Sequence, residues 1–141
     1  MPGSVKFFYE GVKFTLKNPR KVSSWIKAAI LKEKKEPGQL NYIFCSDSYL
    51  LKINLDYLNH NTYTDIITFD TSDAIGLIEG DVYISIDRVD ENSKTFGNTF
   101  ENELHRVMIH GALHLLGYSD KSPKQKSIMR RKEDAYLSLR K

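Results

Sequence analysis

Two histidines and an aspartate in the C-terminal half of this 141-residue chain have the types and spacing of metal ligands: His110, His114 and Asp120. Residues four apart on a helix project about 40° apart on one face, so two imidazoles with this spacing can hold one tetrahedral ion. Gly117 is a typical residue after a helix end, and the chain can turn there to bring Asp120 beside His114. Two histidines and one carboxylate leave a fourth position for water, which is typical of a catalytic zinc site.

The residues around the two histidines are almost all apolar, which indicates a buried helix. They are Leu104, Val107, Met108, Ile109, Leu113, Leu115 and Leu116. Imidazoles in such a helix must find partners, because unsatisfied polar groups inside a protein are costly. A metal ion is one such partner. A packed, hydrogen-bonded histidine pair without a metal is the alternative that these residues leave open.

Gly111 follows the first histidine, at the position where the hydrolase motif H-E-x-x-H has a glutamate. In peptide hydrolases with the motif H-E-x-x-H, the residue after the first histidine is a glutamate that serves as general base. Glycine cannot do so, and the sequence therefore argues against a thermolysin-like protease. A glycine here also lets a neighbouring element or a ligand approach the backbone closely.

Hydrophobic patterns and capping residues predict the elements that position these side chains. β-Branched and aromatic residues predict strands over residues 5–9, 12–14, 40–45, 65–69 and 81–86. Helices are predicted from Asn18-Pro19 towards residue 35 with a stop at Pro37-Gly38, from Ser46 or Asp47 to Leu58, over 87–96, from Asn98 or Thr99 to Leu116, and from Ser122-Pro123 to about residue 139. This order predicts an α+β fold: a single domain over residues 1–141, with a mixed central sheet of about four strands and helices packed around it.

Charge is distributed unevenly although the net charge is only +3. Residues 1–35 hold nine basic and two acidic residues, residues 36–120 hold four basic and fourteen acidic ones, and residues 121–141 hold eight basic and two acidic ones. An acidic centre between basic flanks suits a cation site beside a polyanion. The alternative, which charge alone favours, is that the basic residues form the solvated faces of two surface helices. One cysteine, no long apolar run and no apolar leader predict a soluble, cytoplasmic protein without a membrane anchor.

Residues 110–120, with the sequence HGALHLLGYSD, resemble the signature H-G-x-L-H-L-x-G-Y-D-H of the YbeY family of bacterial metal-dependent endoribonucleases. Three further pieces follow the family's order: residues 54–69, which end in TDIITF, residues 80–85 with the sequence GDVYIS, and Met129 with Glu133 in the last predicted helix. Together the pieces cover about residues 40–137, and the signature is the specific one among them.

Two positions depart from the family pattern. Asp120 stands where the family usually has a third histidine, and a carboxylate is an acceptable zinc ligand. Leu58 stands where the family carries an arginine implicated in activity, and a leucine cannot contact a phosphate. Arg106, one turn before His110, is a candidate phosphate contact in its place. The alternative, which we favour, is that Arg106 pairs with Glu103 or Asp81. His105 is expected at the surface or between helices, and His60 in a loop.

The resemblance implies a single-strand-specific endoribonuclease that takes part in ribosomal RNA maturation, notably at the 3′ end of 16S ribosomal RNA, and in ribosome quality control. It implies one divalent metal ion, most simply Zn²⁺, held by His110, His114 and Asp120, with ribosomal RNA and the small subunit as partners and no DNA. Two other functions stay open. One is a metal-dependent hydrolase of another bond, and the other is a non-catalytic ribosome-assembly factor with a structural metal.

Overall fold

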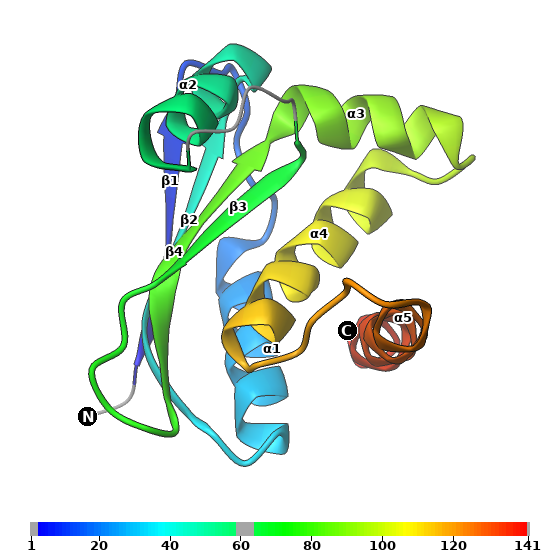
Figure 1. The fold of residues 1–141 in the computed structure, drawn as a ribbon. Helices are drawn as coiled ribbons and strands as arrows, with labels where there is room; N and C mark the ends of the chain where they lie inside the picture. The colour runs from blue at the N-terminus through cyan, green and yellow to red at the C-terminus, as the bar shows by residue number, and fades with distance from the viewer. Residues whose placement is uncertain (1–2, 59–63, 141) are drawn as a thin grey trace.

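Four strands form one mixed sheet in the computed structural model, which describes residues 3–58 and 64–140. The strands are β1 (Ser4–Glu10), β2 (Glu36–Cys45), β3 (Ile66–Asp70) and β4 (Leu77–Ser85), in the order β1-β2-β4-β3. β1, β2 and β4 run parallel, and β3 pairs antiparallel with β4 at one edge (Figure 1). This arrangement confirms the predicted α+β fold and its mixed sheet of four strands.

The helices in the described residues are α1 (Pro19–Lys32), α2 (Asp47–Leu58), α3 (Ile86–Thr95), α4 (Phe100–Leu115) and α5 (Pro123–Leu137). α1 and α4 cover one face of the sheet, and α5 packs against α4 on the side away from the sheet (Figure 1). Alternation along β2 sends Leu40, Tyr42 and Phe44 into this main core. α2 covers part of the opposite face, where Cys45, Leu50, Ile53 and Ile67 form a smaller cluster.

Local capping chemistry fixes the ends of the helices near the candidate site. The Thr99 side chain accepts a hydrogen bond from the backbone N–H of Asn102 and begins α4, and Ser122 forms a capping box with Gln125 at the start of α5. Both helix starts agree with the sequence.

Two predictions about the N-terminal third are wrong. Pro37-Gly38 does not stop α1, which ends at Lys32; these residues lie inside β2. A proline is tolerated there because it is the second residue of the strand and precedes an irregularity in the pairing with β4 between Pro37 and Leu40. Residues 12–14 form no strand. Phe14 instead packs its ring against Phe44 and Phe100 in the core.

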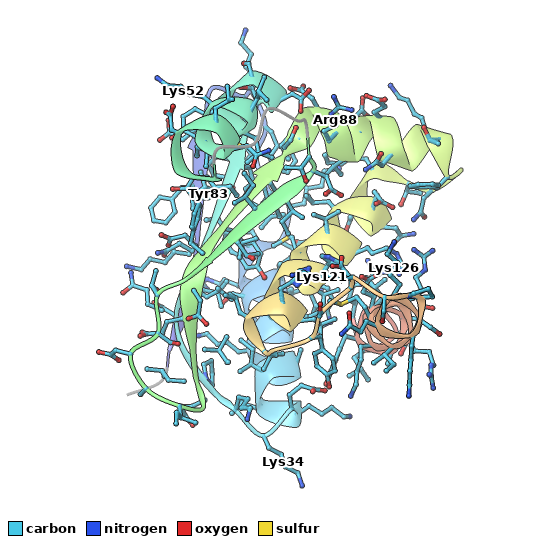
Figure 2. All side chains as sticks on the ribbon, in the orientation of Figure 1. Lys34, Lys52, Tyr83, Arg88, Lys121 and Lys126 are labelled. Atoms are coloured by element: carbon cyan, nitrogen blue, oxygen red, sulfur yellow. The ribbon has the colours of Figure 1, made fainter. Side chains whose placement is uncertain are left out.

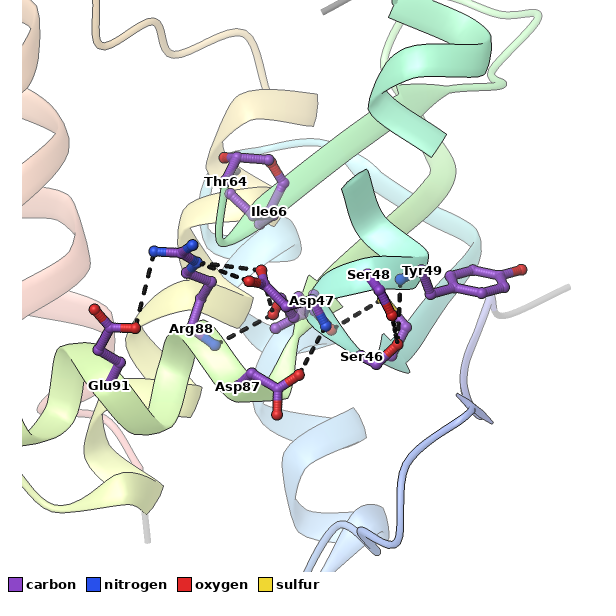
Figure 3. Close-up of polar contacts among 12 residues, drawn as sticks. Ser46, Asp47, Ser48, Tyr49, Thr64, Ile66, Asp87, Arg88 and Glu91 are labelled. Atoms are coloured by element: carbon purple, nitrogen blue, oxygen red, sulfur yellow. Dashed lines mark hydrogen bonds and ion pairs between the residues drawn. The ribbon is translucent and has the colours of Figure 1, made fainter. Parts of the chain in front are cut away.

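A polar network joins the carboxyl ends of β2 and β4, which lie side by side in the sheet (Figure 3). The Asp47 backbone N–H donates to the Asp87 carboxylate at 2.8 Å, and the Asp47 carboxylate accepts from the Arg88 guanidinium at 3.1 Å. Ser85 caps α3 by accepting from the backbone N–H of Arg88. The starts of α2 and α3 are thereby tied together at the end of the sheet where β3 begins.

Candidate metal centre

α4 packs against the sheet at Gly111, where there is no room for a side chain. A Cβ atom at this position would lie 2.8 Å from Val82 Cγ1 and 2.9 Å from Ile66 Cδ1, both shorter than real contacts allow. Position 111 therefore faces the sheet and not the two histidines. The close approach that Gly111 permits is that of a neighbouring element, and a glutamate here would have neither the room nor the direction to act as a base beside His110.

The turn after α4 brings Asp120 back to the two histidines. Gly117 adopts a φ of 106°, in the left-handed region that favours glycine. The N–H of Gly117 donates to the His114 carbonyl, and the N–H of Tyr118 donates to the Leu113 carbonyl, each at 3.0 Å. These two bonds form the Schellman motif that ends many helices. The sequence had predicted this turn from Gly117 alone.

Three potential ligand atoms converge as a result. His110 Nε2 lies 2.9 Å from His114 Nε2 and 3.3 Å from Asp120 Oδ2, and His114 Nε2 lies 3.6 Å from the same Asp120 oxygen. Ligands at about 2.05 Å from a tetrahedral ion are separated by about 3.35 Å, so the three observed separations bracket the value that zinc requires. Among the described residues, this trio is the group whose ligand atoms could hold a metal ion.

Glu133 on α5 fixes the orientation of His110. Its Oε2 atom lies 2.6 Å from His110 Nδ1, and the side chain is almost completely buried. A carboxylate at Nδ1 places the ring proton there and leaves Nε2 free to bind a metal, as is usual for metal-binding histidines. The sequence patterns did not predict the contact between Glu133 and His110, although the family resemblance had pointed to Glu133. No local pattern could place it, because it lies 23 residues away in the chain.

Arg106 is paired, but not with the expected partners. Its guanidinium donates to Glu133 Oε1 at 2.8 Å and to Asp134 Oδ1 at 2.7 Å, and the side chain is 17 % exposed. Glu103 and Asp81 were the wrong candidates, because the sequence could not show that α5 packs along this side of α4. Arg106 thus holds the far oxygen of the carboxylate that orients His110. Its contact with a phosphate stays a prediction.

Burial and neighbouring carboxylates move the pKa values of the two histidines in opposite directions. Burial alone would lower the pKa of His110, but the hydrogen bond and charge of Glu133, with Asp120 and Asp65, outweigh it and raise that pKa. Burial and the charge of His110 lower the pKa of His114. A histidine binds a metal through a deprotonated nitrogen, so the lowered pKa of His114 favours a cation there, whereas a proton on His110 competes with it.

Asp65 is a further acidic residue at this site. It lies just before β3, and its backbone carbonyl accepts a hydrogen bond from the Ser85 N–H at 3.0 Å. Burial raises the pKa of its carboxyl group, and the charges of His110 and Asp120 also act on it. The sequence had placed Asp65 in a strand without assigning it to the site. The family resemblance, through the piece ending in TDIITF, was the available signal.

Glu33 anchors the loop that carries Asp120. It lies just after α1, and its carboxylate accepts hydrogen bonds from the Tyr118 hydroxyl at 2.6 Å, from Lys132 Nζ at 3.0 Å and from the Tyr136 hydroxyl. Burial opposes the charge on Glu33, but these hydrogen bonds outweigh it and lower its pKa. One partly buried carboxylate therefore joins the end of α1, the loop after α4, and α5.

The remaining sequence candidates lie elsewhere. His105 is buried between helices, where its ring packs against Trp25 and its Nδ1 atom accepts from Arg140 at 2.8 Å, in agreement with the interhelix position expected. His60 lies outside the described residues. Leu58 is the last residue of α2, and nothing is described of its side chain.

The fold and the site together define a class of protein: an α+β domain in which two histidines on a buried helix and a carboxylate from the following turn form a candidate catalytic metal centre. The family model described as Endoribonuclease YbeY matches residues 10–140. The chain therefore belongs to the YbeY family.

Full-length relatives agree with this assignment. The chain is 52 % identical over 138 residues to the Endoribonuclease YbeY of Cytophaga hutchinsonii, covering 98 % of this chain and 96 % of that protein. It is 42 % identical to the Endoribonuclease YbeY of Bacteroides fragilis, with 98 % and 99 % coverage. A solution structure of a Thermotoga maritima protein superposes with a TM-score of 0.63 at 28 % identity, over 94 % of this chain and 87 % of that one. None of the helices in the described residues has the length and apolar composition of a transmembrane span.

Proposed function

We propose that this chain is a metal-dependent endoribonuclease that hydrolyses phosphodiester bonds in single-stranded RNA, with one Zn²⁺ bound by His110, His114 and Asp120. The observation that carries the proposal is the convergence of three ligand atoms at separations of 2.9, 3.3 and 3.6 Å on a helix held rigidly against the sheet. The names of the relatives support RNA as the substrate, and a ligand set without thiolate favours zinc.

The chain's own residues prepare this site for hydrolysis. Glu133 holds a proton on His110 Nδ1 and so directs the lone pair of Nε2 toward the ion. Asp120 adds one negative charge to the ligand set. The chemistry supplied by a divalent ion in this position is Lewis acidity, which activates water and offsets negative charge on phosphate oxygens. Asp65, just before β3, is a third carboxylate, after Glu133 and Asp120, whose charge acts on His110.

The substrate we propose is single-stranded ribosomal RNA, notably the 3′ end of the small-subunit RNA, with the ribosomal small subunit as partner and the cytoplasm as location. Basic residues of 13–35 and 121–141 supply the electrostatic attraction to the RNA backbone. Figure 2 shows Lys121 and Lys126 beside α4 and α5, whereas Lys52 lies at α2, away from them.

The experiment that tests this function combines metal analysis with RNA cleavage. Protein purified without chelator should contain one zinc per chain and cleave a single-stranded RNA, and His110→Ala and His114→Ala should each lose both properties. Asp120→His restores the commoner ligand set and should keep the metal, whereas Asp120→Ala should bind it clearly more weakly. Full metal content in both histidine variants would refute the ligand assignment. Cleavage of peptide or ester substrates in preference to RNA would refute the substrate.

A further inference from the structure

A pocket lies away from the candidate metal centre, between α1 and the helices α4 and α5. Its volume of about 510 Å³ is within the range of small-molecule sites. Its apolar wall includes Trp25, Ala29 and Tyr136. Trp25 is 8 % exposed, and its indole N–H donates to the Tyr136 carbonyl at 2.7 Å, which fixes the ring at the wall.

Four cationic side chains surround this apolar wall. Two of them, Arg20 and Lys21, belong to the first turn of α1, and Lys17 lies two residues before that helix. The fourth, Arg140, lies three residues after the end of α5. One acidic residue, Glu101, also lines the pocket. The two basic segments of the sequence therefore meet at one place in the fold, where Lys21 and Arg140 line the same pocket although they are more than 100 residues apart along the chain. Among the ion pairs between described residues, none involves any of these four cations.

Arg140 is held in place by neutral groups. Its guanidinium donates to His105 Nδ1 at 2.8 Å, to Asn102 Oδ1 at 2.9 Å and to the Leu137 carbonyl at 3.0 Å. Because an arginine can only donate, Nδ1 of His105 is an acceptor and the imidazole is uncharged. These partners orient the guanidinium without neutralising it, so Arg140 contributes a positive charge to the lining of the pocket.

We propose that this pocket, which we call the basic pocket, binds one nucleotide of single-stranded RNA, with the phosphate among the four cations and the base against the Trp25 wall. The proposal rests on the proposed function, since it names how the same substrate is held. An acidic peptide shares the charge. The aromatic wall favours the nucleotide, because proteins that bind single strands combine basic grooves with aromatic side chains on which bases pack.

α5 connects the basic pocket to the candidate metal centre. Glu133 contacts His110, and Tyr136, about one turn further along the helix, lines the pocket. Three residues of helix correspond to about 4.5 Å along its axis. The basic pocket and the candidate metal centre therefore share one helix, and the pocket would act as a subsite that positions the strand.

Trp25 allows this occupancy to be measured directly, because it is the chain's single tryptophan. His114→Ala protein, which prevents cleavage, is titrated with a 5′-phosphorylated uridine dinucleotide while tryptophan fluorescence is recorded. We expect a saturable change in the fluorescence. Replacing both Arg20 and Lys21 with Gln should weaken binding and reduce the slope of log K against log salt by up to about 1.4, two phosphate contacts at about 0.7 each.

The matched control is the double variant Lys52→Gln and Lys94→Gln, which removes two exposed charges that lie outside both basic segments and do not line the basic pocket. Its affinity for the dinucleotide should change less than twofold. An unresponsive Trp25, equal losses in both double variants, or tighter binding of an acidic leucine-containing peptide would each overturn the proposal. RNA cleavage by the parent without any Trp25 response would overturn the basic pocket alone. A Trp25 response in metal-loaded protein that cleaves no RNA would instead overturn the proposed function.

Discussion

Replacing Glu133 with Gln tests how the candidate metal centre is oriented. Glu133 uses both oxygens, Oε1 toward Arg106 and Oε2 toward His110 Nδ1, and it is only 5 % exposed. A glutamine has one acceptor. Because Arg106 can only donate, the amide oxygen must stay with Arg106, and the amide N–H then points at His110 Nδ1. The imidazole proton is thereby moved to Nε2, the atom that should bind the metal.

The expected loss follows from this change of tautomer. A hydrogen bond to a charged group contributes about 1.5–3 kcal/mol, and removing such a partner of a metal-binding histidine costs about 10- to 100-fold in affinity. We therefore expect Glu133→Gln to bind zinc 10- to 100-fold more weakly than the parent, as measured by competition with a chromophoric chelator. Circular dichroism should show that the fold is retained, because the amide still bonds both neighbours.

Asp134→Asn is the matched control for this experiment. Asp134 bonds the same arginine at 2.7 Å, but it is 58 % exposed and has no contact with His110 among the described interactions. Its replacement should change zinc affinity by less than about twofold. Zinc affinity in Glu133→Gln equal to that of the parent would refute the reasoning, and so would an equal loss in both variants, which would show that the shared arginine and not the histidine contact is responsible.

Three further predictions concern the supporting structure. Gly111→Ala should destabilise the protein by about 1–3 kcal/mol in urea unfolding, because the added methyl collides with Val82 and Ile66, and an unchanged midpoint would contradict the close packing of α4. Glu33→Gln should be less stable than the parent at neutral pH. Since the folded-state pKa of Glu33 is lowered, this difference should be full above the unfolded pKa of about 4.5 and disappear as the pH falls through the folded pKa, so a difference that persists in acid would contradict it. Charge reversal at both Arg130 and Arg131 should reduce the salt slope of RNA binding by about one unit without loss of metal, and an unchanged slope would remove them from the RNA contacts.

Features set by local chemistry could be predicted from the sequence. The order of strands and helices, the caps at Thr99 and Ser122, and the pairing of His110 with His114 all depend on residues a few positions apart. Asp120 could be added because Gly117 determines the turn between it and the helix. Each of these inferences needed only helix geometry or a backbone preference, and the structure brings the same three side chains together.

Features set by packing between distant segments could not be predicted. The partners of Arg106 were wrong because they come from α5, whose placement along α4 depends on the whole core. β2 begins earlier than its apolar pattern suggested, at Glu36, because pairing with β4 extends the strand through a proline. Glu133 and Glu33 join segments that are 23 or more residues apart. Patterns within a single sequence indicate only contacts between residues a few positions apart, so they could not predict these two.

α1, like α5, extends from the basic pocket to the surroundings of the candidate metal centre. Trp25 and Lys21, in its first half, line the basic pocket, and Glu33, just past its end, holds the loop of Asp120. The helix is about 21 Å long and is a rigid body on the sheet. Glu33 is therefore the contact through which a shift of this helix would reach the loop of Asp120. By thermodynamic reciprocity, any factor by which a nucleotide in the pocket changes zinc affinity is the factor by which zinc changes nucleotide affinity, so zinc affinity measured with and without the dinucleotide shows whether α1 couples the two sites.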